Sequence, residues 1–132
     1  MSTRTRISAE STEQLKLLEK KTRLTPNILA RLAIALSMED EAPFTEPVKD
    51  HGGLEFNHST LYGEHEVIYR HLAIQWAGTV TEPEKILSQH LERGVEKLRD
   101  LLATHTIADL ADVRITPRAH ARKYTRVKES VS

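Results

Sequence analysis

The chain has 132 residues, no cysteine, and 19 basic against 19 acidic side chains, so its formal net charge is zero. This length suits one domain with a modest core. Without cysteine the chain cannot form a disulfide, a thiolate metal site or a cysteine nucleophile, which excludes redox chemistry by the chain itself. No apolar stretch comes near the roughly 20 residues that span a bilayer. We therefore expect a soluble, cytoplasmic protein with no membrane partner.

The neutral total hides a segregation of charge along the chain. Basic side chains outnumber acidic ones by 7 to 3 in residues 1–37 and by 6 to 1 in residues 113–132, whereas residues 38–66 hold 1 basic and 8 acidic side chains. A neutral protein with basic ends can still present a positive face to an anionic partner. Nucleic acid is one candidate partner, and self-association between basic and acidic faces is the alternative.

A first helix is expected to start at Ser8 or Ser11. Ser11 is followed three residues later by Gln14, the arrangement of a capping box in which each side chain satisfies a free backbone N–H of the other residue. Leu15 and Leu18 would then share the buried face of this helix.

Thr25 and Pro26 are a stronger start signal for a second helix. The threonine hydroxyl can cap the helix, and proline at the first helical position loses no hydrogen bond that the helix needs. The helix that follows, to about Met38, is apolar on nearly every side. This pattern predicts burial on more than one side, either by other helices of the same subunit or by a second copy of the chain.

Residues 39–58 form an acidic stretch that contains two prolines and two glycines. Such a stretch is expected to be a loop without regular structure. A third helix is expected from about Gly63 to Ala77, where apolar side chains recur at helical spacing.

A fourth helix is indicated by Thr81 and Pro83 and should run to about Thr104. Gly94 lies inside it and weakens it by roughly 1 kcal/mol relative to alanine, which is not enough to end it. A short helical turn is expected at residues 107–111. The predicted fold is mainly α, a small single-domain bundle of four to five helices with an irregular motif loop between helices two and three.

Residues 53–64, here called the motif segment, have neither helical nor strand periodicity. A domain this small rarely spends a dozen residues on an irregular segment without a function. We interpret the segment chiefly as a self-packed loop in which Phe56 and Leu61 are anchors. Asn57 and Thr60 would satisfy free backbone groups and cap the next helix.

Two stretches of the sequence match the pattern of a known family. The first is the run Leu24-Thr25-Pro26-Asn27-Ile28-Leu29, and the second is the Glu-Phe-Asn signature of the motif segment with its ending in Leu, one further residue, Gly and Glu. On these residues the chain resembles the DndE family of DNA sulfur modification proteins, over residues 6–112. The motif residues are Thr25, Pro26, Asn27, Glu55, Phe56, Asn57, Thr60, Leu61, Gly63 and Glu64.

The resemblance implies a small helical protein that binds duplex or nicked DNA within the machinery that replaces a non-bridging phosphate oxygen by sulfur. It also implies a homo-oligomer, with a tetramer favoured, and other DNA sulfur modification proteins as partners that carry the desulfurase, iron–sulfur and ATPase chemistry. No cofactor is expected in this chain. Residues 1–112 would form the DndE-like helical domain and residues 113–132 a basic C-terminal tail.

Basic side chains gather at helical spacing in the first helix and again in the tail. Lysine and arginine bind a phosphate backbone as fixed counterions and release condensed ones, which makes affinity fall with salt. The candidate DNA-binding residues are Lys16, Lys20, Lys21, Arg23 and Arg31 in the first two helices and Arg118, Arg122 and Arg126 in the tail. The alternatives are a solvated helix face on which Glu13 and Glu19 pair with the cations, and a tail that only solubilises the chain.

An enzymatic alternative is a nicking endonuclease of the same pathway, with His58, Glu64 and His65 as its catalytic residues. The spacing of these residues is unspecific for a metal site, and we expect no metal. The sequence has neither a Gly-x-x-x-x-Gly-Lys phosphate loop nor a Gly-x-Ser-x-Gly elbow, so nucleotide hydrolysis and esterase chemistry have no support. A further alternative is a scaffold that contacts only other modification proteins.

Overall fold

The computed structural model describes residues 4–45, 50–79 and 82–108. The chain divides into two units, residues 1–101 and 102–132. The packing described below belongs to the first unit, and the described part of the second holds only the end of the last helix and one turn at residues 107–108.

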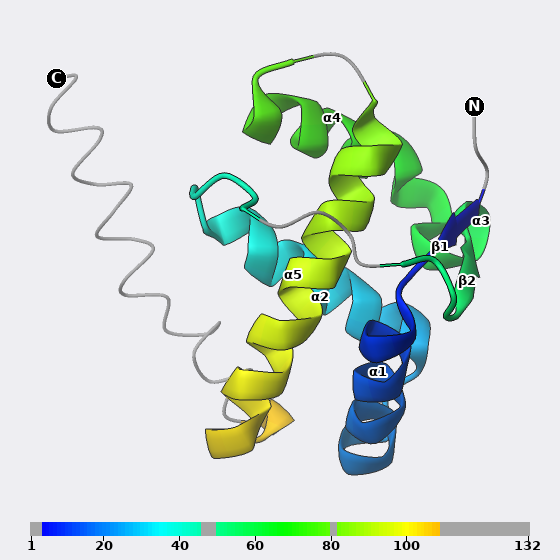
Figure 1. Ribbon diagram of the computed structural model, residues 1–132, viewed down its shortest axis with the longest axis vertical. Helices are drawn as coiled ribbons and strands as arrows, with labels where there is room; N and C mark the ends of the chain where they lie inside the picture. The colour runs from blue at the N-terminus through cyan, green and yellow to red at the C-terminus, as the bar shows by residue number, and fades with distance from the viewer. Residues whose placement is uncertain (1–3, 46–49, 80–81, 109–132) are drawn as a thin grey trace, which may run out of the picture. The chain divides into compact units, whose positions relative to one another are not determined.

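The described residues are mainly helical, which confirms the predicted fold class (Figure 1). In chain order the elements are β1 (Arg4–Arg6), α1 (Ala9–Thr22), α2 (Pro26–Glu39), β2 (Glu55–Asn57), α3 (His58–Leu61), η1 (Gly63–His65), α4 (Glu66–Ala77) and α5 (Pro83–Thr104). Within the described chain no helix combines the length and the apolar character needed to cross a bilayer.

Helix α1 begins after Ser8, whose side chain accepts a hydrogen bond from the backbone N–H of Ser11 at 3.1 Å. Of the two starts considered, Ser8 is therefore correct, and the capping box at Ser11 is wrong. Ser11 lies inside the first turn, because the Ser8 carbonyl already accepts the backbone N–H of Thr12. Leu15 and Leu18 are buried as expected.

Helix α2 begins as predicted at Thr25 and Pro26, with the threonine side chain accepting from the backbone N–H of Ile28 at 3.4 Å. Its buried face holds Leu29, Ala30, Ala33, Ile34 and Ser37. Ile28 on another face is 40% exposed. Leu32 and Leu36, outside this face, are half-buried, so the described chain covers α2 fully on one side and partly on others.

The motif segment has more regular structure than expected. Its β2 pairs antiparallel with β1 in a two-stranded sheet, with Thr5 opposite Phe56 and Arg6 opposite Glu55. A four-residue helix, α3, and a 3₁₀ turn, η1, follow at once, so that α4 starts at Glu66 rather than at Gly63. The expectation of an irregular loop was wrong because three-residue strands are too short to show a period in the sequence.

Helix α5 crosses α2 in close contact at Gly94 (Figure 1). A Cβ atom on Gly94 would lie 1.8 Å from the backbone oxygen of Ala33, far inside van der Waals contact. The glycine therefore permits the close crossing, and the helix continues through it as predicted. The core around this crossing is apolar, with Leu87, Leu91, Val95 and Leu98 of α5 each no more than 1% exposed.

Candidate nucleic-acid interface

The cations at the C-terminal end of α1 are exposed. Lys16, Lys20, Lys21 and Arg23 all lie on the surface, and Lys20 and Lys21 are in the last turn of the helix. Positive side chains are favoured there, because the free carbonyl groups of a helix C-terminus carry partial negative charge. The side chains of the row predicted from the spacing thus reach the solvent.

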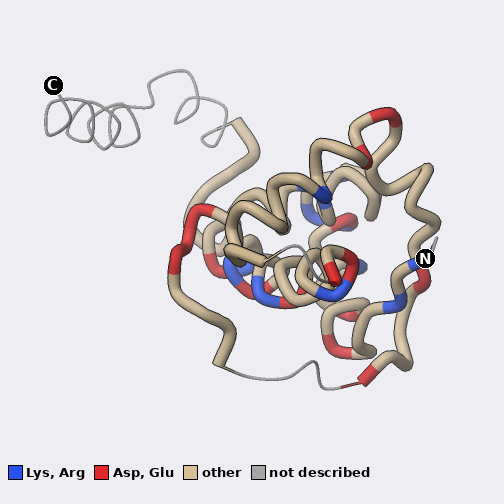
Figure 2. The backbone as a smooth tube through the Cα atoms, turned by 90° about the horizontal axis from the view of Figure 1, so that it is seen from above, with Lys and Arg blue, Asp and Glu red and all other residues tan. Residues whose placement is uncertain are grey.

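Lys16, Lys20 and Arg23 form no ion pair with any carboxylate of the described chain. The pairs with Glu13 and Glu19 that a merely solvated helix face would favour are not formed. This distinguishes the row from other basic residues of the described chain, such as Arg70, Lys97 and Arg99, which meet carboxylates at 2.5 to 3.1 Å. Figure 2 marks the basic and acidic positions along the backbone; residues 38–45 and 50–66 carry acidic positions and no Lys or Arg.

Arg31 has a different environment from the α1 row. Its guanidinium donates to the backbone oxygen of Leu61 and, at 3.1 Å, to that of Thr60. Both acceptors belong to α3 in the motif segment, so Arg31 ties this segment to α2. Nothing in the sequence indicated this contact, since the acceptors are backbone groups about thirty residues away.

The tail residues Arg118, Arg122 and Arg126 lie outside the described residues. The described chain therefore offers the α1 row and Arg31 as the predicted DNA-binding residues whose surroundings are known.

The motif residues pack largely as predicted. Phe56 is 3% exposed and Leu61 fully buried. Asn57 caps α3, its side-chain oxygen accepting from the backbone N–H of Ser59 at 2.9 Å and from the hydroxyl of that residue at 2.7 Å. The segment is thus held by its own side chains and by Arg31.

The three residues of the endonuclease alternative do not form one site in the described chain, since one is buried and the other two lie together on the surface. His58 is 3% exposed and is hydrogen-bonded through Nε2 to the Thr5 hydroxyl at 2.6 Å. Burial lowers the pKa of His58, so its neutral form is favoured. Glu64 and His65 are exposed, with 3.8 Å between His65 Nε2 and Glu64 Oε1. No group of three or more His, Asp or Glu residues in the described chain could hold a metal ion.

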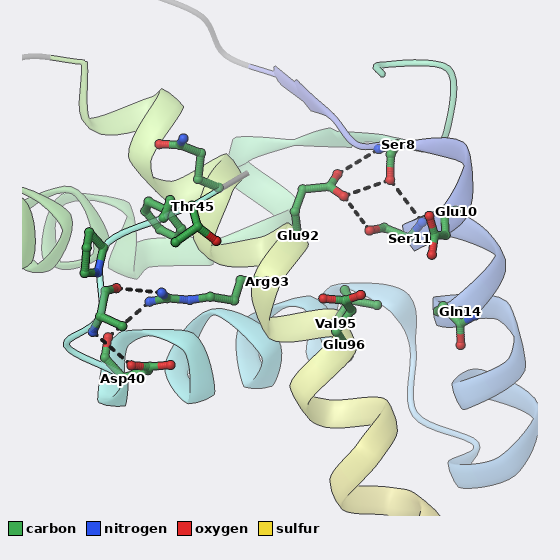
Figure 3. A pocket seen from close by; sticks show the side chains of 14 residues that line it. Ser8, Glu10, Ser11, Gln14, Asp40, Thr45, Glu92, Arg93, Val95 and Glu96 are labelled. Carbon is green, nitrogen blue, oxygen red and sulfur yellow. Dashed lines mark hydrogen bonds between the residues drawn. The ribbon is translucent and has the colours of Figure 1, made fainter. Parts of the chain in front are cut away.

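A pocket of about 390 Å³ lies between α1, α5 and the start of the acidic stretch (Figure 3). On one side Glu92 accepts from the backbone N–H of Ser8 at 2.8 Å and from the Ser8 and Ser11 hydroxyls. On the other side Arg93 donates to the backbone oxygens of Ser37, Asp40 and Ala42. These two adjacent side chains fix α5 to both neighbours, so the charged groups of Glu92 and Arg93 are engaged in structure.

Comparison with known proteins identifies the family. The chain matches the model described as DNA sulphur modification protein DndE over residues 4–106. It belongs to the DndE family. This confirms the resemblance found in the sequence.

Two solved structures of DndE proteins share the fold of this family member. One, a DndE from Escherichia coli B7A involved in DNA phosphorothioation modification, is 30% identical with a TM-score of 0.62, covering 74% of this chain and 98% of that one. The other, a DndE mutant involved in DNA phosphorothioation, is 29% identical with a TM-score of 0.62, covering 76% and 99%. Among curated proteins no match was found.

Proposed function

We propose that this DndE family member is a DNA-binding accessory protein of the DNA phosphorothioate modification system. It binds the backbone of duplex or nicked DNA as a homo-oligomer and works with other proteins of that system. The observation that carries this proposal is the exposed row of cations at the end of α1, where Lys16, Lys20 and Arg23 form no ion pair within the described chain. Family membership indicates DNA as the polyanion.

Repulsion within the charge row opposes the stabilisation that the helix C-terminus gives to its cations. Lys16, Lys20 and Arg23 stand one turn apart, and like charges at this spacing destabilise a helix by a few tenths of a kcal/mol per pair. A phosphate backbone converts the repulsion into attraction and releases condensed counterions. With Lys21 the row supplies about four contacts, so affinity should fall on the order of 100-fold between about 50 and 200 mM salt.

Arg31 is left out of the main contact set, because its guanidinium already holds two backbone carbonyls. The tail arginines would contact phosphates beyond those that α1 contacts.

The oligomeric part of the proposal is supported by apolar surface on α4. Val67, Ile68 and Leu72 are 64%, 55% and 43% exposed, and their spacing puts them on one side of the helix. Single exposed apolar residues are ordinary, but a cluster on one helix face is typical of an interface. A second copy of the chain would bury it.

The test is a binding titration with labelled duplex, intact and nicked, at several salt concentrations. The triple variant Lys16→Gln, Lys20→Gln, Lys21→Gln should lower the slope of log affinity against log salt by about 3. For a matched single change, Lys20→Gln is compared with Arg99→Gln, which removes one charge from an exposed and paired position on α5. Unchanged affinity and slope in the triple variant would refute the assignment of α1. Absence of any salt-sensitive binding by the wild-type protein would favour the scaffold alternative.

A further inference from the structure

A second cleft in the described chain, of about 610 Å³, lies between β1 and the first turns of α5. Most of its lining side chains can donate hydrogen bonds, and several carry positive charge. The lining residues that can donate a hydrogen bond to an anion include Arg4, Arg6, His51, Lys85, Ser88 and Gln89. None of them belongs to the α1 row.

One wall of the cleft is formed by β1. Arg4 and Arg6 alternate with the buried Thr5 and therefore project from the same side of the strand. Both guanidiniums meet the carboxylate of Glu55 at 3.4 Å, one at each oxygen. Arg6 also donates to the backbone oxygen of Gly53 at 3.1 Å. The pairs with Glu55 are exposed, and exposed pairs of this length contribute little stability, so a phosphate could compete with Glu55 for the two guanidiniums.

The opposite wall is one face of α5. Lys85, Ser88 and Gln89 stand at i, i+3 and i+4 and therefore lie side by side. Lys85 is exposed and forms no ion pair with a carboxylate of the described residues. The one acidic side chain of the lining, Glu84, is held in an ion pair by Arg70. The cleft thus combines cations from two elements with neutral hydrogen-bond donors.

We propose that this cleft binds a phosphate group of a DNA strand, a site that extends the proposed function and rests on it. Arginine presents a planar fork of donors that matches a phosphate, and lysine adds a compact charge. The cleft borders the strand that precedes α1, whereas the cation row extends from Lys16 in the middle of that helix to its C-terminal end. A helix of 14 residues is about 21 Å long. The cleft and the cation row are therefore separate along α1, so one subunit would contact the backbone at two separate places.

The test uses the full chain and Lys85→Gln, since the Lys85 side chain has no ion pair whose loss would disturb the fold. This variant should lower the slope of log affinity against log salt by about 0.9. Arg99→Gln removes the same charge from the same helix, about 21 Å further along, and should leave the slope unchanged. Ser88→Ala should weaken binding severalfold without changing the slope, because it removes a donor and no charge.

A second arm titrates inorganic phosphate into the labelled protein and follows the amide resonances of residues 85–89. If Lys85→Gln binds DNA as Arg99→Gln does, the cleft proposal is refuted while the α1 assignment stands. If in addition free phosphate shifts those resonances, the cleft takes phosphate from solution and not from DNA. If the wild-type protein does not bind DNA, both proposals fail.

Discussion

Acidification should destabilise this protein through a buried histidine of α5. His90 is fully buried, with Nδ1 hydrogen-bonded to the Ser37 hydroxyl at 2.7 Å. Its ring forms T-shaped contacts with the rings of Phe44 and Trp76, at centroid distances of 4.8 and 4.3 Å. Nε2 has no hydrogen-bond partner in the described chain. Burial, reinforced by the nearby charge of Arg93, lowers the pKa of His90 from 6.5 to about 4.

The direction of the effect follows from proton binding in the two states. Between pH 6.5 and about 4 the unfolded chain binds a proton at position 90 that the folded chain does not accept. Stability is therefore fully retained above pH 6.5 and is lost as the pH falls toward 4. With these two pKa values, the loss attributable to His90 is about 2 kcal/mol between about pH 7 and pH 5, and about 3 kcal/mol at still lower pH.

The assay is urea unfolding at pH 7 and pH 5 of the wild type and of His90→Asn. The side-chain amide of asparagine can replace Nδ1 as the partner of Ser37 but does not titrate. The variant is expected to be less stable at both pH values, yet to lose about 2 kcal/mol less than the wild type between them. His71→Asn, on the exposed side of α4, should keep the wild-type pH dependence. Equal losses in the wild type and His90→Asn would refute the reasoning, and an NMR titration of the His90 ring measures the pKa directly.

Two other substitutions test the packing of α2 and α4. Gly94→Ala should destabilise the fold by about 2 kcal/mol, because the added methyl clashes with the Ala33 carbonyl. The clash outweighs a gain in helix propensity of about 1 kcal/mol. Urea unfolding that shows equal or higher stability of the variant would contradict this. Ile68→Glu should lower the particle mass in light scattering if another copy covers α4. Leu17→Glu, equally exposed on α1, is the control that should leave the mass unchanged. A constant mass in both variants would argue against α4 as the contact.

The sequence predicted the helices well because their signals are local. Thr25 and Pro26 act within one turn of the helix that they start, and α2 begins where they indicated. The small sheet was missed for the opposite reason. Its two strands are about fifty residues apart and three residues long, so neither shows enough alternation to be recognised before it is paired.

The same distinction between local and long-range features applies to the candidate site. The exposure of Lys16 and Lys20 follows from helical spacing, which the sequence contains in full. The contacts of Arg31 with α3 and of Glu92 with Ser8 join elements distant in the chain. Spacing carries no information on such contacts, and only the packed fold shows which polar side chains hold structure and which remain available to a ligand.

The motif segment acquires a physical role from these long-range contacts. Its strand β2 pairs with β1, and its His58 is hydrogen-bonded to the buried Thr5 at the centre of that strand. Because neighbouring positions of a strand project to opposite sides, fixing Thr5 inward turns Arg4 and Arg6 outward. The segment that carries the family motif thus positions the two arginines on which the proposed phosphate cleft depends, without any of its own side chains having to perform chemistry.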